Sequence, residues 1–298
     1  MESILILGTG ALATLFAARL ASSGANVSML GTWQAGLGAL QRDGARLVLE
    51  NGSELVGRVR ATDDPAACRG AQLVLVLVKA WQTERAASQL RECLADDGLA
   101  VSLQNGLGNR ETLSRFLRKA RVGLGVTTLG ATLLGPGQAG YGGDGPVSVE
   151  TGHPRLGALE RMLNGAGFRV ELVPDAHALV WGKLVVNSAI NPLTALLGVP
   201  NGVLLERPGA RDLMTALARE TATVAQALGV ALPFDDAAVA VEAVARRTAS
   251  NRSSMLQDVQ RGARTEIDAI CGAVARAGDA PLNRVMWQLV ESLASAPR

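Results

Sequence analysis

The sequence has few of the residues from which metal sites, disulfide frameworks and charged binding surfaces are built. Its 298 residues include three cysteines without a CxxC pair, and its two histidines, His153 and His177, are too few and too badly spaced for a metal site. The 29 basic and 27 acidic residues leave a net charge of +2 without long runs of either sign. We therefore expect a small-molecule partner rather than nucleic acid or a membrane.

Long apolar stretches are also scarce. Outside the N-terminal region, no eighteen consecutive residues are all apolar, so no transmembrane helix is expected. The apolar run from Ile4 to Ala21 could be mistaken for a secretory signal, but Glu2 replaces the positive region of such a signal and Arg19 interrupts the run. These features and the unpaired cysteines predict a cytoplasmic protein in a reducing compartment.

Short apolar runs alternate with helical patterns over the first half of the chain. Residues 3–7 form one such run, residues 8–13 a glycine-containing turn, and a helical pattern reaches Ser23 before a second run at 26–30. This βαβ pattern predicts a parallel sheet with right-handed connections. Further strands are expected at 73–78, 99–103, 122–127 and 168–172, antiparallel edge strands within 131–151, helices near 82–95 and 154–165, and a hairpin around Asn51-Gly52.

The second half of the chain has a different character. From Asp175 onward no convincing strand remains, and alanine- and leucine-rich segments at helical spacing reach the C-terminus. We expect a dinucleotide-binding Rossmann-like domain over residues 1–174 and a helical domain for substrate binding and dimerisation over residues 175–298.

The turn after the first strand has the GxGxxA pattern of dinucleotide-binding loops. Gly8 allows the tight turn, Gly10 lets the backbone approach a pyrophosphate, and Ala13 lets helix and strand pack closely. The pyrophosphate would then lie at the N-terminus of the helix, where the helix dipole favours negative charge. The predicted cofactor-binding residues of this loop are Gly8, Thr9, Gly10, Ala11, Leu12 and Ala13.

The residue that contacts the adenosine ribose is expected at the end of the second strand. This chain has Gly31-Thr32 there, neither the acid typical of NAD binding nor an arginine for the phosphate of NADP. Lys79 follows a buried strand at the edge of the sheet where ligands gather and could supply the missing positive charge. The alternative is an ordinary solvated lysine.

A lysine and two asparagines follow one another at helical spacing. On a helix Lys183, Asn187 and Asn191 share one face, and their neighbours are apolar. Buried polar groups need partners, and a bound keto acid could supply them. Alternatively, this face meets solvent or the other domain. Pro192 is expected to end or kink the helix at Asn191.

A third polar segment runs from Asn251 to Asp268. If it is helical throughout, Ser254 and Glu266 lie about 18 Å apart along the axis and serve different ends of a site. From the residues alone, a helix cap and a surface carboxylate are the better explanation of this segment.

Four blocks of the chain, in order, resemble the ketopantoate reductase (2-dehydropantoate 2-reductase) family over essentially the whole length. They are the glycine loop, VKAWQ at 78–82 with QNG at 104–106, KLVVNSAINPLTA at 183–195 with PNG at 200–202, and SSMLQD at 253–258 with TEID at 265–268. The resemblance implies a Rossmann-like α/β domain, an all-α C-terminal domain like that of 6-phosphogluconate dehydrogenase, and an active site in the cleft between them.

The resemblance also implies an activity and residue roles. The activity is NADPH-dependent reduction of ketopantoate to (R)-pantoate in pantothenate biosynthesis (EC 1.1.1.169), with Lys183 as the proton donor. The implied substrate-binding residues are Asn105, Lys183, Asn187, Asn191, Asn201 and Ser254. The implied cofactor contacts, beyond the glycine loop, are Thr32, Lys79, Asn105, Ala131 and Glu266.

The chain departs from the family at one position and leaves two alternatives open. The family commonly has an arginine where Gly31-Thr32 stands, so NADPH is the expected cofactor and NADH is not excluded. One alternative is an oxidoreductase of the same kind acting on another 2-keto acid. The other is a protein that senses NADPH without turnover, which the presence of Lys183 disfavours. A homodimer formed through the helical domain is compatible with all three.

Overall fold

The computed structural model describes residues 2–295, and their contacts divide the chain into two compact units. The first unit runs to Gln104 and resumes from Asn109 to Ala176. The second combines Asn105–Gly108 with the described chain from His177 on. A short loop from the first half of the sequence therefore packs as part of the helical unit.

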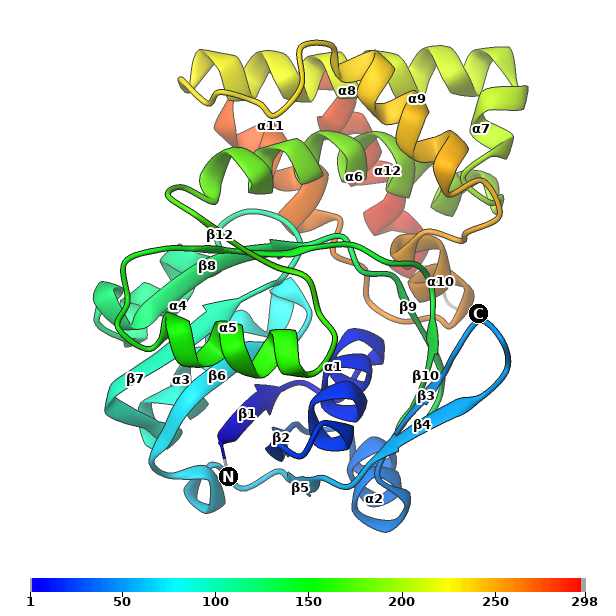
Figure 1. The fold of residues 1–298 in the computed structure, drawn as a ribbon. Coiled ribbons are helices and arrows are strands. Elements are labelled where there is room, and N and C mark those ends of the chain that lie inside the picture. Colours follow the sequence, from blue (N-terminus) through cyan, green and yellow to red (C-terminus); the bar gives the residue numbers. More distant parts are fainter. Residues whose placement is uncertain (1, 296–298) are drawn as a thin grey trace. The chain divides into compact units, whose positions relative to one another are not determined.

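An eight-stranded sheet forms the centre of the first unit (Figure 1), with the order β12-β11-β8-β7-β6-β1-β2-β5. Its neighbours are parallel except for β11 beside β8. Leu7 pairs with both Leu30 and Val76, so the carboxyl ends of three central strands reach the same level. The strands are β1 (Ser3–Leu7), β2 (Asn26–Leu30), β5 (Arg60–Thr62), β6 (Ala71–Val76), β7 (Leu94–Ser102), β8 (Val122–Thr127), β11 (Val147–Glu150) and β12 (Val170–Val173).

Helices cover both faces of this sheet, as its apolar central strands require. Ile4 and Ile6 pack in one core with α1 (Ala11–Ser22) and α5 (Leu156–Gly165). The alternate residues Leu5 and Leu7 pack in another core with α3 (Thr83–Cys93) and α4 (Asn109–Phe116). The predicted parallel α/β architecture is therefore confirmed. The remaining helical elements of the unit are α2 (Gln34–Asp43), η1 (Pro65–Cys68), η2 (Ala80–Gln82) and η3 (Lys119–Arg121).

A second, four-stranded sheet has the order β4-β3-β10-β9. Its first two strands are antiparallel and flank Gly52, whose φ of 80° suits the turn. The predicted hairpin is thus confirmed, although it belongs to a larger sheet and the segment after it continues into β5 of the main sheet. The strands are β3 (Ala45–Val48), β4 (Glu54–Gly57), β9 (Ala131–Gly135) and β10 (Gln138–Tyr141).

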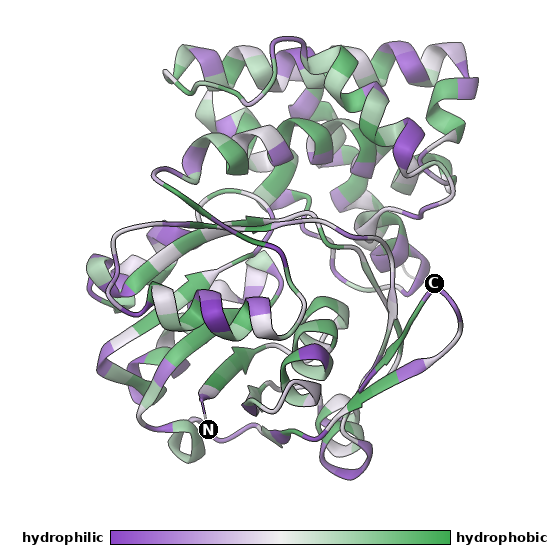
Figure 2. Ribbon diagram, viewed as in Figure 1, coloured by the Kyte–Doolittle hydropathy of each residue, from purple (hydrophilic) through white to green (hydrophobic). Residues whose placement is uncertain are grey.

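The helical unit is built around α6, which contacts α8, α9, α10 and α12. Figure 2 shows apolar and polar residues mixed along these helices, as expected where one face is buried and the other is not. None of the helices in residues 2–295 is long and apolar enough to cross a membrane. The elements are α6 (His177–Leu197), α7 (Val203–Glu206), α8 (Pro208–Ala227), α9 (Ala237–Arg247), α10 (Ser254–Gln260), the π-helical turn η4 (Asp268–Gly272), α11 (Ala273–Ala277) and α12 (Pro281–Ser295).

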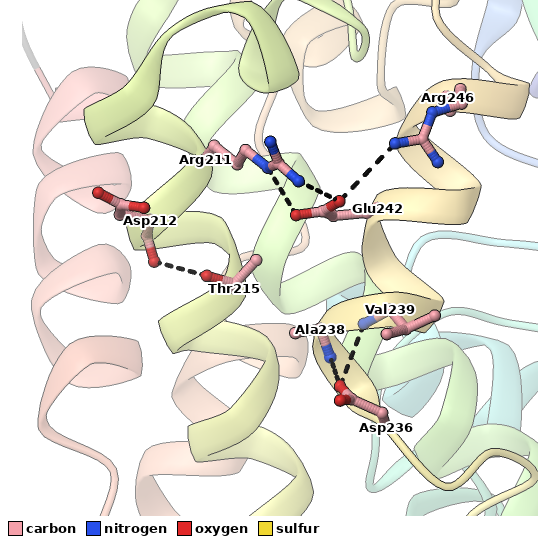
Figure 3. Close-up of polar contacts among 8 residues, drawn as sticks. All are labelled: Arg211, Asp212, Thr215, Asp236, Ala238, Val239, Glu242 and Arg246. Atoms are coloured by element: carbon pink, nitrogen blue, oxygen red, sulfur yellow. Dashed lines mark hydrogen bonds and ion pairs between the residues drawn. The ribbon is translucent and has the colours of Figure 1, made fainter.

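Two polar contacts fix α9 at its start and along its length (Figure 3). The carboxylate of Asp236 accepts hydrogen bonds from the backbone N–H groups of Ala238 and Val239, a cap of the kind that stabilises a helix by about 1 kcal/mol. Further on, Arg211 of α8 donates two hydrogen bonds, of 2.6 and 2.7 Å, to Glu242. The helix ends at Arg247, and Thr248 is its C-terminal cap residue.

Of the two effects expected of Pro192, an end or a kink of the helix at Asn191, the first is wrong, because α6 continues through Pro192 to Leu197. Proline has no N–H to donate to the carbonyl four residues earlier, that of Ser188. The thiol of Cys271, from the π-helical turn, points at this carbonyl oxygen with an Sγ–O distance of 3.7 Å. A weak donor from elsewhere in the unit therefore replaces the missing helical hydrogen bond.

Residues 251–268 do not form one helix, so the condition for the expected separation of Ser254 and Glu266 is not met. The helix α10 ends at Gln260, and Gly262 follows with a φ of 65°. Its N–H donates to the carbonyl of Val259, and the N–H of Ala263 to that of Asp258, the paired bonds of a Schellman motif. The predicted 18 Å separation along one axis therefore does not apply to Ser254 and Glu266.

Candidate functional site

The glycine loop makes a tight turn and leaves open space before the first turn of α1. Gly8 has a φ of 128°, and a Cβ there would lie 3.0 Å from the carbonyl group of Leu77. Gly10 is the N-terminal cap residue of α1, and a Cβ on it would meet no atom within 4 Å. Its missing side chain thus leaves the approach to the first helical turn open, while Ala13 is fully buried against the sheet. Ala11 and Leu12 are partly buried in that first turn.

The end of β2 lies beside this loop. Gly31 is buried, and a Cβ on it would lie 2.6 Å from the Cγ2 atom of Thr9, which is itself buried. Thr32 is exposed, and the ring of Trp33 packs over Gly36 in the first turn of α2. The position expected to contact the adenosine ribose therefore offers a hydroxyl group and an aromatic ring, without a charge.

Lys79 stands at the same edge of the sheet. It lies three residues after Val76, which pairs in register with Leu7 just before the glycine loop. Its N–H donates to Oε1 of Gln82 and its carbonyl accepts from the N–H of that residue, closing η2. Lys79 is partly buried, which fits both a cofactor contact and a lysine whose amine is in solvent. Ala131 begins β9 in the small sheet and packs against the apolar core of the same unit.

A cavity of about 600 Å³ in the first unit lies away from these residues. Its lining includes Ser3 and Ile4, at the amino end of β1, and Ala71 and Gln72, at the amino end of β6. Ligands of parallel sheets bind outside the carboxyl ends of the strands. We therefore place the candidate cofactor site at the glycine loop and not in this cavity.

Lys183 lies in α6 of the helical unit, partly buried among apolar neighbours. Burial lowers the pKa of its amine from 10.5 to about 8, and the negative charge of Glu266 acts in the opposite direction. Glu266 is itself 6% exposed, so the surface-carboxylate interpretation is wrong. An amine with this pKa can both carry a proton and release it near neutral pH.

The loop that joins the helical unit brings Asn105 to the same carboxylate. Nδ2 of Asn105 donates to Oε2 of Glu266 at 3.1 Å. The N–H of Leu107 donates to the carbonyl oxygen of Ala269 at 3.0 Å. Gly106, between them, has a φ of 81°, and any Cβ on it would overlap that carbonyl oxygen. The structure thus brings Asn105 and Glu266 into contact and places the charge of Glu266 close enough to shift the pKa of Lys183.

The other predicted substrate-binding residues lie along α6 and the segments that pack on its end. Asn187 is partly buried and Asn191 is 7% exposed. One turn later the hydroxyl groups of Thr194 and Ser253 are 2.7 Å apart. Ser253, and not the exposed Ser254, caps α10 by accepting from the N–H of Leu256.

Asn201 completes this group from the segment after α6. Its N–H donates to the carbonyl of Asn251, and its Nδ2 donates to the hydroxyl oxygen of Thr248 at 2.9 Å. Thr248 is a residue that the sequence interpretation did not single out. Thr194 therefore joins the end of α6 to the start of α10, and Asn201 joins the segment after α6 to the end of α9 and the loop that follows it.

The histidines make local hydrogen bonds, and the cysteines are buried thiols. His177 accepts a hydrogen bond from the indole N–H of Trp181, and Nδ1 of His153 accepts from the N–H of Arg155. Burial raises the pKa of the Cys93 thiol to about 12 and also raises that of Cys68 and Cys271. Among residues 2–295 no group of three His, Cys, Asp or Glu side chains could hold a metal ion.

Comparisons with known protein families decide the relationship. The model described as "Ketopantoate reductase PanE/ApbA" matches residues 4–153, and "Ketopantoate reductase PanE/ApbA C terminal" matches residues 175–294. The chain belongs to the ketopantoate reductase family. The 2-dehydropantoate 2-reductase of Archaeoglobus fulgidus is 38% identical to it, over 99% of both chains.

Solved structures agree with this family and fold. A PanE/ApbA family ketopantoate reductase from Ralstonia eutropha JMP134 superposes with a TM-score of 0.90 at 33% identity, over 99% of both chains. A D-mandelate dehydrogenase solved with NADH and anilino(oxo)acetate has a TM-score of 0.91 at 24% identity, over 99% of both chains. That second likeness shows a shared fold only, because fold does not determine substrate.

Proposed function

We propose that this protein is an NADPH-dependent 2-dehydropantoate 2-reductase that reduces ketopantoate to (R)-pantoate in pantothenate biosynthesis. The observation that carries the proposal is Lys183, a partly buried lysine whose pKa is lowered to about 8 in a chain 38% identical to a 2-dehydropantoate 2-reductase over nearly its full length. The lysine supplies the proton that the reaction needs, and the relatives supply the substrate class.

Lys183 acts on the carbonyl oxygen. During reduction, negative charge develops on this oxygen, and an ammonium group beside it both stabilises the charge and protonates the product. With a pKa of about 8, Lys183 is largely protonated at pH 7 and still acidic enough to give up its proton. Glu266 prevents the pKa from falling further, which keeps the amine charged under these conditions.

The asparagines orient the keto acid. A carboxamide offers two donors and an acceptor, so Asn187 and Asn191, on the same helix as Lys183, suit a carboxylate and a carbonyl group. Asn105 is held by Glu266 with its amide in a defined direction. These residues bind and position the substrate, and Lys183 alone among them moves a proton.

The glycine loop suits a dinucleotide. Gly10 leaves room beside the N-terminus of α1, and Gly8 allows the tight turn that precedes it. These residues, with Lys79 at the same sheet edge, would hold the pyrophosphate and the ribose phosphate. When bound, the nicotinamide supplies the hydride that the C2 carbon of the keto acid receives.

The choice of NADPH over NADH depends on Lys79 in this proposal. Thr32 carries no charge, and Gly31 cannot take a larger residue without displacing Thr9. Lys79 is then the positive side chain that favours the phosphate of NADPH. We place the enzyme in the cytoplasm, where its three buried thiols remain reduced.

The test is a panel of steady-state assays on the purified protein. NADPH oxidation is followed by the loss of near-ultraviolet absorbance with ketopantoate and with other 2-keto acids, and each assay is repeated with NADH. Turnover that prefers ketopantoate and NADPH supports the proposal. Preference for a different 2-keto acid would assign another substrate, and NADPH binding without oxidation of any keto acid would indicate a sensor.

A further inference from the structure

The side chain of Asn201 is buried with half of its amide unused. The residue is 8% exposed, and its Oδ1 atom has no hydrogen-bond partner within residues 2–295. A buried acceptor without a donor is unfavourable, because it has lost its hydrogen bond to water and gained none in return. A bound ligand is one group that can provide the missing donor.

Thr248 determines which end of the amide remains unused. Its hydroxyl group donates to the carbonyl oxygen of Val244 at 2.8 Å, one turn earlier in α9. The single hydroxyl proton is thereby committed, so the oxygen can only accept. It accepts from Nδ2 of Asn201 at 2.9 Å, which leaves Oδ1 as the free end of the amide.

The backbone prevents Asn201 from turning away. Its N–H donates to the carbonyl of Asn251, and the N–H of Gly202 donates to that of Ala249, each at 3.0 Å. A Cβ on Gly202 would lie 2.6 Å from the Cβ of Ala249. The segment that contains Asn201 therefore packs closely against residues 248–251. Asn201 is held there by its backbone N–H and by the Nδ2 atom of its side chain.

We propose that Thr248 is a positioning residue that presents the amide oxygen of Asn201 to a hydroxyl group of the substrate, and that this contact selects hydroxylated 2-keto acids. The proposal rests on the function proposed above. A carbonyl or carboxylate group cannot satisfy Oδ1, because both only accept. Ketopantoate carries a hydroxyl group on C4, whereas 3,3-dimethyl-2-oxobutanoate is the same molecule without it.

The experiment compares these two substrates in the wild type and in Thr248→Val. The wild type is expected to favour ketopantoate in kcat/KM by at least about tenfold, because a site built to bind a hydroxyl group rejects the analogue that lacks it. Thr248→Val keeps the size of the side chain and removes both hydrogen bonds. It should lower kcat/KM for ketopantoate by about tenfold and leave that for the analogue unchanged.

Two further variants separate positioning from folding. Thr248→Ser keeps the hydroxyl group and should retain the wild-type preference for ketopantoate. Thr248→Ala removes the hydroxyl group, as Thr248→Val does, and should lose the preference to the same extent although its side chain is smaller. Glu242→Gln, which removes an exposed ion pair of the same helix, should leave the preference unchanged. Equal loss on both substrates in Thr248→Val, or loss of the preference in Thr248→Ser, would overturn the proposal.

The failure of this inference is distinguishable from failure of the proposed function. If the wild type reduces neither keto acid, the function itself is wrong and the inference falls with it. If the wild type reduces both equally well, the enzyme is a 2-keto acid reductase but Asn201 does not select the hydroxyl group. That second result comes from the wild type alone, so it does not depend on whether any variant folds.

Discussion

Asn105 and Glu266 lie 161 positions apart in the sequence, and Nδ2 of the first donates a hydrogen bond to Oε2 of the second at 3.1 Å. Glu266 in turn raises the pKa of Lys183 against the effect of burial. One buried carboxylate therefore acts on both Lys183, the proposed proton donor, and Asn105, a proposed substrate-binding residue.

The pH dependence of the reaction should follow the titration of Lys183. Its pKa is lowered to about 8, and the protonated amine is the active form, so kcat/KM for ketopantoate should be constant below this pH. Above it, kcat/KM should fall about tenfold for each pH unit. A profile that rises through pH 8 would mean that the neutral amine is the active form.

In Glu266→Gln, the fall of kcat/KM with rising pH should begin at a lower pH than in the wild type. Removing the negative charge leaves burial as the main influence on Lys183, and its pKa falls further. The profile is measured at saturating NADPH, so that any change in cofactor affinity does not enter. The control is Glu242→Gln, which changes a partly buried carboxylate of the same unit and should leave the pH profile in place. A shift to higher pH in Glu266→Gln would contradict the account.

Gly106→Ala should reduce activity because it displaces the loop that carries Asn105. The new Cβ would overlap the carbonyl oxygen of Ala269, and the φ of 81° is itself unfavourable for alanine. We expect a loss of about 1 to 3 kcal/mol in the free energy of unfolding and at least about a tenfold lower kcat/KM. Gly108→Ala is the matched control, since its φ is 85° but its Cβ would meet no atom within 4 Å. Equal effects of the two substitutions would show that strain, and not the contact with Ala269, determines the loss.

Lys79→Ala should raise the KM for NADPH much more than the KM for NADH, because only NADPH carries the phosphate on the adenosine ribose. Lys119→Ala removes an exposed lysine from the same unit and should change neither KM. Steady-state assays with both cofactors measure the effect. Equal increases for NADPH and NADH in Lys79→Ala would remove the proposed role of this lysine.

Much of the fold follows from local sequence patterns. The run at Ser3–Leu7, the glycine turn and the helix after it were predictable because each element has its own periodicity and its own turn residues. The end of α10 was predictable in principle, since Gly262 is the glycine of a Schellman motif, a signal that the sequence analysis did not use.

Other features depend on contacts that no local pattern contains. The helix α6 continues past Pro192 while a thiol 83 residues from Ser188 points at the carbonyl that proline leaves unused. In the same way, helical spacing placed Lys183, Asn187 and Asn191 on one helix. It could not place Glu266 near Lys183 or Thr248 beside Asn201, because both relationships arise from tertiary packing.

The most direct test of the account is the activity of Lys183→Ala with ketopantoate and NADPH, measured beside the affinity of the variant for NADPH. We predict that kcat falls by about 100-fold or more, as expected for loss of a general acid, while the dissociation constant for NADPH and the thermal stability stay close to those of the wild type. A kcat within about threefold of the wild type would contradict the assignment of Lys183 as the proton donor.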